Sequence, residues 1–207
     1  LHNKNIKIIA VLRNPINRFI SAYFHNMRYG FIPVLSPEIG ILKILQKDKE
    51  FLEKYPRAHE ILEYGFYGKY LERYLELFKP NQVKILLHDE LIKHKEESIK
   101  SIYEFLRINS KFKSSRLEKR PQKVVYNLKA IKFATFINKI LYSYNSSNTR
   151  LYVRKNMQTI EKFNYFNVMN LFFNVYKKPQ LSLEIIREIS NFYEKDIELL
   201  EKLASLN

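Results

Sequence analysis

The run from Ile6 to Leu12 constrains the fold most, because it is apolar and largely β-branched over the length of one strand. Only Lys7 interrupts it, so we expect a strand buried on both faces, as in parallel sheets. Pro15 follows closely and suits the first position of a helix, since its fixed φ is helical and its missing N–H is not needed there. The sequence therefore predicts a strand that leads through Arg13 into a helix beginning near residue 15.

The helix after Pro15 has two faces. Apolar side chains recur at spacings of three and four, which predicts a face that packs on the sheet: Ile16, Phe19, Ile20, Tyr23, Phe24 and Met27. Another face carries cations, a hydroxyl and an imidazole: Asn14, Arg18, Ser21, His25 and Arg28. Arg13 is expected at the carboxyl edge of the strand, beside the positive end of the helix dipole, which predicts a phosphate site. The alternative is that Arg13 pairs with a structural carboxylate and the polar face is only solvated.

This arrangement resembles the 3′-phosphate-binding motif of sulfotransferases that use 3′-phosphoadenylyl sulfate (PAPS). In that motif a strand ends in an arginine, a proline opens the helix, and a serine follows eight residues after the arginine. The segment Leu12 to Pro15, together with Arg18, Ser21 and Tyr23, matches the pattern. The resemblance implies that Arg13 holds the 3′-phosphate through a bidentate guanidinium and that Ser21 donates a hydrogen bond to it.

A second segment, Tyr64 to Phe78, has the Gly-x-Tyr-x3-Leu-x2-Tyr/Trp-x3-Phe form of bacterial and glycan sulfotransferases. A strand over Val83 to Leu87, the acidic-acidic-Leu signature Asp89 to Leu91 and a helix ending at residues 105–106 follow in the order that the family has. A weaker match lies in a long helix after Ser182, for which a packing role is the alternative: Tyr193, Asp196, Leu200, Glu201 and Leu203.

The resemblance also implies further site residues. From Ser110 to Pro121 the chain is basic and loop-like, as in a late loop that closes over the 3′-phosphate in this family, the alternative being a solvated linker. The expected cofactor contacts are Arg13, Arg18, Ser21, Tyr67, Arg116, Lys119 and Arg120. The catalytic base is not identified, because the family's base lies before the first motif or in the variable insertion; His25 is expected to donate a hydrogen bond behind the site, with a role as the base as the alternative. No metal is expected.

One part of the family pattern is missing. These enzymes begin with a strand and a Lys-x-Gly-Thr/Ser-Thr/Ser loop that cradles the 5′-phosphosulfate, and none of the four glycines lies in such a loop. We therefore expect residues 1–207 to be a single sulfotransferase domain, the carboxyl-terminal two-thirds or so of it, unable to catalyse transfer alone. The expected fold is three-layer α/β, like a P-loop NTPase, with an incomplete central parallel sheet and a mostly helical subregion over 124–207.

Composition agrees with anionic ligands. Thirty-six Lys and Arg against 21 Asp and Glu leave a formal charge of +15, which suits PAPS, an acidic glycan, nucleic acid or a membrane surface. The absence of cysteine excludes disulfides and thiol chemistry and favours a cytoplasmic bacterial enzyme. No apolar run reaches membrane-spanning length, although peripheral membrane contact stays open. No nucleic-acid-binding motif is recognisable, so specific nucleic-acid binding is not expected.

Two further stretches carry predictions of structure. The segment 31–63 predicts a loop, a helix from about Pro37 to Lys54, a break at Pro56 and a short helix, and its acidic residues and His59 are candidate acceptor contacts. The segment from Val124 predicts a basic amphipathic helix, a polar break over residues 145–149 and a second helix from roughly Met157 to Tyr176. The ordinary role of these helices is packing.

The expected activity is transfer of the sulfuryl group from PAPS to a hydroxyl or amine of a saccharide or glycolipid, leaving adenosine 3′,5′-bisphosphate. One alternative is a basic non-enzymatic module that binds an acidic glycan, a membrane surface or nucleic acid. The other is a phosphate-transferring P-loop enzyme, which needs a Gly-Lys-Ser/Thr loop and a metal-binding Asp. The sequence does not indicate an oligomeric state.

Overall fold

The computed structural model describes residues 6–112, 124–158, 170 and 174–204. It is a mixed α/β structure, mostly helical, that divides into two compact units. The first unit comprises residues 1–17, 66–121 and 193–207, and the second comprises 18–65 and 122–192. The divisions fall inside helices α1 (Pro15–Arg28) and α11 (Leu183–Ala204). The expectation of one domain over the whole chain stays a prediction.

The sheet of the first unit consists of two parallel strands, β1 (Ile8–Leu12) and β2 (Val83–Leu87), paired from Ile8 opposite Val83 to Leu12 opposite Leu87. The predicted strands and their parallel pairing are confirmed, but the described residues contain no third strand of a central sheet. Ile9 and Val11 are 37% and 48% exposed. The prediction of burial on both faces was therefore wrong, since alternate side chains of β1 point to a face that this small sheet leaves open.

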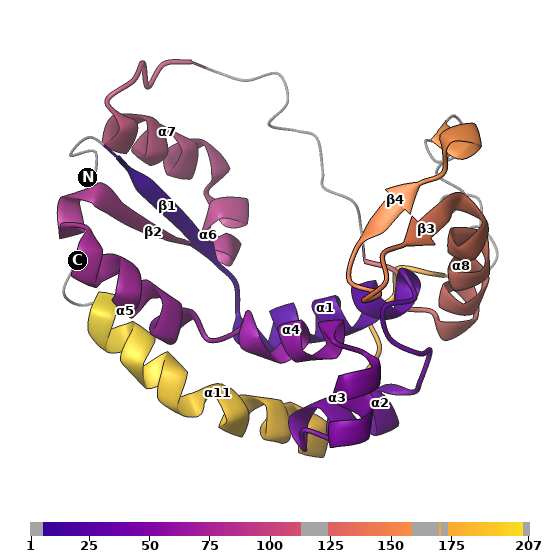
Figure 1. Cartoon of the computed structure of the whole chain (residues 1–207). Helices are drawn as coiled ribbons and strands as arrows, with labels where there is room; N and C mark the ends of the chain where they lie inside the picture. Colours follow the sequence, from indigo (N-terminus) through magenta and orange to yellow (C-terminus); the bar gives the residue numbers. More distant parts are fainter. Residues whose placement is uncertain (1–5, 113–123, 159–169, 171–173, 205–207) are drawn as a thin grey trace. The chain divides into compact units, whose positions relative to one another are not determined.

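Four helical segments complete the described part of the first unit beside α11: α5 (Tyr67–Leu77), the 3-10 turn η1 (Pro80–Gln82), α6 (His88–Lys93) and α7 (Lys95–Leu106). Figure 1 shows the two strands running between α5 and α7. Lys7, the one charge in the apolar run, donates to the Asn81 carbonyl at 2.6 Å and lies 4.7 Å from the ring centroid of Phe105. The predicted order of strand, acidic signature and helix is confirmed.

The second unit contains the rest of α1 with α2 (Pro37–Leu45), α3 (Lys49–Lys54), α4 (Arg57–Glu63) and α8 (Leu128–Leu141). The single helix expected over 37–54 is two helices. Lys47 adopts a left-handed φ of 54°, and Asp48 caps α3 by accepting the Phe51 N–H at 2.9 Å. The hydrogen bond from Lys43 and that N–H hold the pKa of Asp48 below its usual range, which keeps the capping carboxylate charged.

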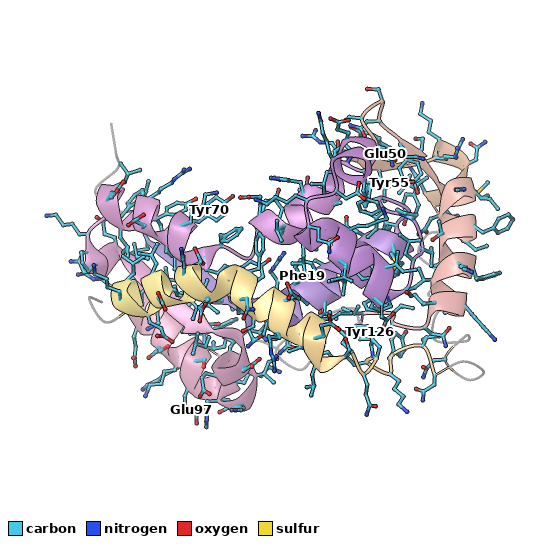
Figure 2. The ribbon with its side chains drawn as sticks, turned by 90° about the horizontal axis from the view of Figure 1, so that it is seen from below. Phe19, Glu50, Tyr55, Tyr70, Glu97 and Tyr126 are labelled. Carbon is cyan, nitrogen blue, oxygen red and sulfur yellow. The ribbon has the colours of Figure 1, made fainter. Side chains whose placement is uncertain are left out.

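The apolar face of α1 forms the core of the second unit. Phe19, Ile20, Tyr23, Phe24 and Met27 are buried, as predicted. We expected this face to pack on the sheet, but its described contacts are with the loop after α1, with α2 and with the residues before α8. The Phe24 ring meets that of Tyr126, just before α8, at 5.1 Å, and Figure 2 labels Phe19 and Tyr126 in this region. A Cβ on Gly40 of α2 would lie 2.0 Å from the Tyr23 hydroxyl, so glycine is what lets α2 approach α1.

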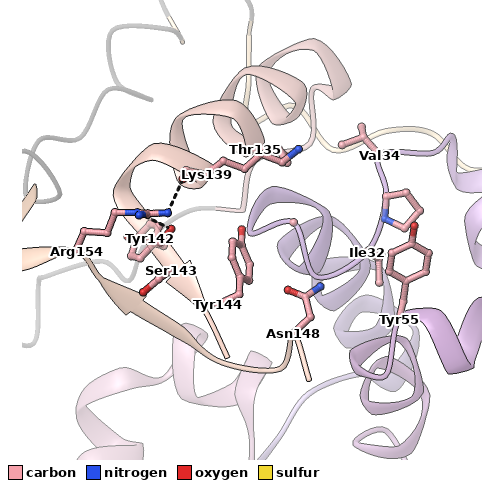
Figure 3. A pocket seen from close by; sticks show the side chains of 12 residues that line it. Ile32, Val34, Tyr55, Thr135, Lys139, Tyr142, Ser143, Tyr144, Asn148 and Arg154 are labelled. Atoms are coloured by element: carbon pink, nitrogen blue, oxygen red, sulfur yellow. Dashed lines mark hydrogen bonds between the residues drawn. The ribbon is translucent and has the colours of Figure 1, made fainter. Parts of the chain in front are cut away.

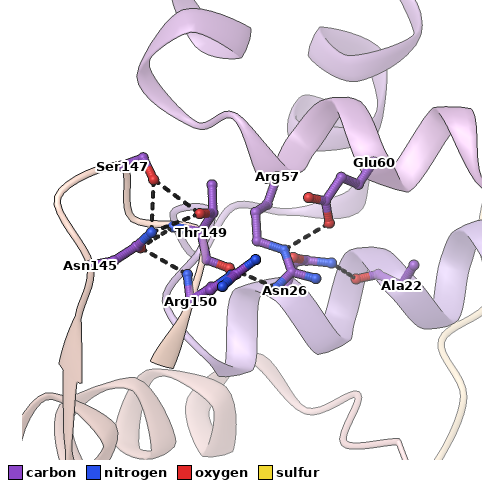
Figure 4. A network of polar contacts seen from close by, with 8 residues as sticks. All are labelled: Ala22, Asn26, Arg57, Glu60, Asn145, Ser147, Thr149 and Arg150. Carbon is purple, nitrogen blue, oxygen red and sulfur yellow. Dashed lines mark hydrogen bonds and ion pairs between the residues drawn. The ribbon is translucent and has the colours of Figure 1, made fainter. Parts of the chain in front are cut away.

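The polar break predicted over residues 145–149 lies in a β-hairpin and does not simply separate two helices. β3 (Tyr142–Tyr144) pairs antiparallel with β4 (Leu151–Val153), followed by the 3-10 turn η2 (Lys155–Met157). Asn145 Oδ1 accepts the N–H groups of Thr149 and Arg150 at 2.7 and 2.9 Å (Figure 4), as asparagine commonly does in turns. The expected second helix lies mostly outside the described residues.

Candidate functional site

The candidate site begins where β1 meets α1. Arg13 directly follows β1 and is half-buried. Asn14 Oδ1 accepts the N–H of Asn17 at 3.0 Å, and Pro15 is the first helical residue, so Asn14 is the helix N-cap. The predicted helix start is confirmed. The Asn14 side chain is committed to the cap and does not belong to the ligand-facing stripe in which we expected it.

Ser21 lies on the same side of α1 as Asn14. The two residues are seven positions apart, which is about two turns or about 10 Å along a helix axis. Ser21 is buried, with 9% of its surface exposed. The shared role of Arg13 and Ser21 in one anion site stays a prediction.

The rest of the polar stripe is less open than predicted. Arg18 donates through Nη2 to the Ile61 carbonyl of α4, and Arg28 is 8% exposed. Asn138 of α8 donates to the Arg28 carbonyl at 2.7 Å. The alternative of a merely solvated face does not describe these two residues, because contacts with α4 and α8 enclose this side of the helix. The Arg18 guanidinium therefore links α1 to α4 through this hydrogen bond.

After Asn14, His25 is the one member of the stripe that keeps a large part of its surface exposed. It lines a cavity of about 440 Å³ together with Arg57 of α4 and Arg150 of the hairpin. The protein around the imidazole shields it from water and lowers its pKa, and the charges of Arg28 and Arg57 lower that pKa further. A neutral imidazole is able to accept a proton, which suits the candidate base.

Arg57 connects this cavity to the hairpin. Its Nη1 donates to the Thr149 carbonyl at 3.0 Å, and its Nε lies 2.9 Å from Glu60 Oε2 (Figure 4). Glu60 is one of the acidic residues that the sequence offered as acceptor contacts. In the structure it balances the charge of Arg57, so the cavity beside His25 already contains a paired cation.

The start of α5 joins two of the matched segments within the first unit. The Asp196 carboxylate of α11 accepts the N–H groups of Gly68 and Lys69 at 2.9 and 2.8 Å. Tyr67 is the first residue of α5. The sequence offered Asp196 only as a weak match with packing as the alternative, and its capping role was missed. The sequence feature that could have indicated this close contact is Gly68, because a Cβ there would lie 2.5 Å from the Asp196 carbonyl oxygen.

Three of the predicted contacts, Arg116, Lys119 and Arg120, lie outside the described residues. Among residues that the structure does describe, no cluster of three or more His, Asp and Glu side chains is arranged to hold a metal ion. Within that same part of the chain, no helix combines the length and the apolar character needed to cross a bilayer.

Comparison with known proteins gives a consistent assignment. The family model of the sulfotransferase domain matches residues 1–204. A sulfotransferase from Alicyclobacillus acidocaldarius is 23% identical, with a TM-score of 0.46 over 64% of this chain and 51% of that one. A mouse sulfotransferase complexed with PAP is 16% identical, with a TM-score of 0.32 over 97% of this chain and 64% of that one. The chain thus spans about half to two-thirds of the length of these two proteins. No curated protein matched it.

Proposed function

The chain belongs to the sulfotransferase family, and we propose that the full-length protein transfers a sulfuryl group from PAPS to a hydroxyl or amine of a saccharide or glycolipid. The observation that carries this proposal is the junction of β1 with α1. There Arg13 stands between the end of a parallel strand and a capped helix start, with Ser21 farther along the same helix.

The electrostatics of this junction fit a phosphate. Residues 1–37 contain no Asp or Glu, so the first turn of α1 lacks the acidic side chains that commonly neutralise a helix start. The N-cap is the neutral side chain of Asn14. The positive end of the helix dipole and the Arg13 guanidinium therefore act together on an anion bound here.

PAPS supplies the sulfuryl group, and adenosine 3′,5′-bisphosphate is the leaving group. Arg13 pairs with the 3′-phosphate and Ser21 donates a hydrogen bond to it, which hold the nucleotide in place. As the new S–O bond forms, the acceptor hydroxyl loses its proton to a base, for which His25 is the candidate because its lowered pKa leaves it neutral. By the family resemblance, Arg18 and Tyr67 are further candidate contacts of the nucleotide. Positioning and cationic stabilisation of leaving oxygens supply most of the rate, by analogy with phosphoryl transfer.

Calorimetry with adenosine 3′,5′-bisphosphate on the full-length protein tests the proposal. Arg13→Gln should weaken binding about tenfold or more, since a charge-assisted hydrogen-bonded pair is lost, and Ser21→Ala should weaken it about threefold to tenfold. Arg73→Gln, at an exposed position of α5, is the matched control and should leave the affinity unchanged.

The second measurement uses adenosine 5′-monophosphate as the ligand, because it lacks the 3′-phosphate. The parent should bind the bisphosphate better than the monophosphate, and Arg13→Gln should remove most of that preference. Equal affinity of the parent for the two nucleotides, or equal losses in Arg13→Gln and Arg73→Gln, would overturn the assignment of Arg13 to the 3′-phosphate.

A further inference from the structure

The second unit contains a cavity of about 670 Å³ that the proposed function does not use. The loop after α1, the end of α3, α8 and the β3–β4 hairpin supply its walls, as Figure 3 shows. The volume falls within the range of about 300–1,000 Å³ typical of small-molecule sites. Seven of its lining residues carry the argument: Tyr55, Lys139, Tyr142, Ser143, Tyr144, Asn148 and Arg154.

Two cations lie on one wall of this cavity. Lys139 is in the last turn of α8, and Arg154 directly follows β4. Arg154 Nε donates to the Tyr142 carbonyl at 3.2 Å, and its Nη2 lies 3.5 Å from the Lys139 carbonyl (Figure 3). These carbonyls orient the guanidinium but do not cancel its charge. None of the lining residues is acidic.

The cavity beside His25 differs in this respect, because its Arg57 is paired with Glu60. Among the described residues, no carboxylate is within ion-pair distance of Lys139 or Arg154. Two cationic side chains line the cavity and no acidic one does, so the cavity favours an anionic group.

Aromatic and neutral polar groups complete the walls. Tyr144 donates its hydroxyl to the Tyr29 carbonyl at 2.7 Å, which fixes the position of its ring. Gly30, at a φ of 71°, makes room for that ring, since a Cβ there would lie 2.9 Å from the Tyr144 hydroxyl. Burial raises the pKa of Tyr144, so the phenol stays a neutral donor. Ser143 and Asn148 add a hydroxyl and an amide.

We propose that this cavity binds an acidic sugar unit of an oligosaccharide. The tyrosine rings pack against the apolar C–H face of the sugar, while Ser143 and Asn148 exchange hydrogen bonds with its hydroxyls. Lys139 and Arg154 pair with its carboxylate or sulfate group. The proposal rests on the cavity itself and does not depend on the assignment of Arg13.

The test is calorimetric binding of a hyaluronan hexasaccharide, whose uronate units carry carboxylates, to the full-length protein. Its carboxyl-reduced form, which keeps the sugar rings without the charge, and inorganic sulfate, which has the charge without the rings, are the other two probes. The charged hexasaccharide should bind at least about tenfold more tightly than either probe, because both the ion pairs and the ring contacts are then present.

Variants locate the binding. Arg154→Gln should weaken hexasaccharide binding about fivefold to tenfold and Lys139→Gln about threefold, since each removes one ion pair. Lys132→Gln is the matched control: it is an exposed lysine on the same side of α8, two turns earlier, and it does not line the cavity. Lys132→Gln should change the affinity by less than about twofold, because salt screens the effect of a distant charge.

Three results would overturn the proposal. Equal losses in Lys132→Gln and Lys139→Gln would show general attraction of a polyanion to a basic protein. If the carboxyl-reduced hexasaccharide bound as tightly as the charged one, recognition through the carboxylates would be excluded. A loss of adenosine 3′,5′-bisphosphate binding in Lys139→Gln or Arg154→Gln would make this a nucleotide site. If Lys139→Gln and Arg154→Gln keep their nucleotide binding, this proposal is tested separately from the one for Arg13. Thermal unfolding midpoints equal to that of the parent protein exclude unfolding of the variants.

Discussion

Two helices of the first unit begin in different electrostatic settings. At the start of α1 the cap is Asn14, a neutral side chain directly before the helix, and the preceding residue is Arg13. At the start of α5 the cap is the carboxylate of Asp196, which reaches the Gly68 and Lys69 N–H groups from α11. Both arrangements satisfy N–H groups that a helix start leaves without a backbone partner.

The difference decides where an anion can bind. Asp196 already places a negative charge at the positive end of the α5 dipole, so a phosphate there would meet a like charge. The start of α1 has a neutral cap and a neighbouring guanidinium, which together attract a phosphate. A capping residue thus determines whether a helix start already holds a negative charge or is available to an anion.

The largest expected effect comes from Gly68→Ala. An added Cβ would lie 2.5 Å from the Asp196 carbonyl oxygen and 3.1 Å from the Leu200 nitrogen, so α11 would have to shift and the cap would be lost. We expect a loss of about 2–3 kcal/mol in the free energy of unfolding, as for overpacked interiors. Urea denaturation measures it. At an uncrowded helical site the same change stabilises by up to about 1 kcal/mol, so an unchanged or increased stability would contradict the close approach.

Asp196→Ala removes the carboxylate but leaves the backbone of α11 in place. The N–H groups of Gly68 and Lys69 then lose their partner, and we expect a loss of about 1–2 kcal/mol, the upper range for a helix cap. Asp196→Asn, which keeps one acceptor oxygen, should lose less. Urea denaturation of both variants is compared with that of Glu72→Ala, a change at an exposed position of α5. Equal stability of Asp196→Ala and Glu72→Ala would show that the cap contributes nothing.

Asn14→Ala tests the neutral cap at the other helix start. It should cost about 1 kcal/mol of stability, as N-cap losses do. Arg13→Gln should instead weaken bisphosphate binding, so the two neighbouring variants separate capping from ligand binding. Thermal unfolding and calorimetry on both proteins measure this. A stability loss in Arg13→Gln larger than that in Asn14→Ala would assign the arginine to a structural ion pair instead.

The smallest effect concerns the opposite end of α1. A helix end normally raises the pKa of a nearby histidine, but shielding from water and the charges of Arg28 and Arg57 lower the pKa of His25. The unfolded chain therefore takes up a proton more readily, so this contribution favours folding above the ordinary pKa of about 6.5 and is lost as the pH falls below it. His25→Gln should flatten that decline. A proton NMR titration midpoint at or above 6.5 would contradict the lowered pKa.

Local patterns predicted the parts of the fold that depend on neighbours in the chain. The apolar run predicted β1, Pro15 predicted the start of α1, and the spacing from Phe19 to Met27 predicted its buried face. The hairpin over residues 142–153 was missed, because its strands are three residues long and a basic amphipathic helix precedes them without a break. Periodicity needs longer segments to distinguish a strand from the end of a helix.

By itself the sequence determined the family, the Arg13 junction and the expectation of an anion there, because strand, arginine, proline and serine follow one another within a few turns of backbone. Only the tertiary structure decided which cations are already paired and which helix start is already closed. Asp196 accepts the N–H of Gly68, 128 residues earlier, and Arg18 donates to a carbonyl 43 residues away. Contacts at such separations depend on how whole elements pack, and no local pattern of side chains encodes them.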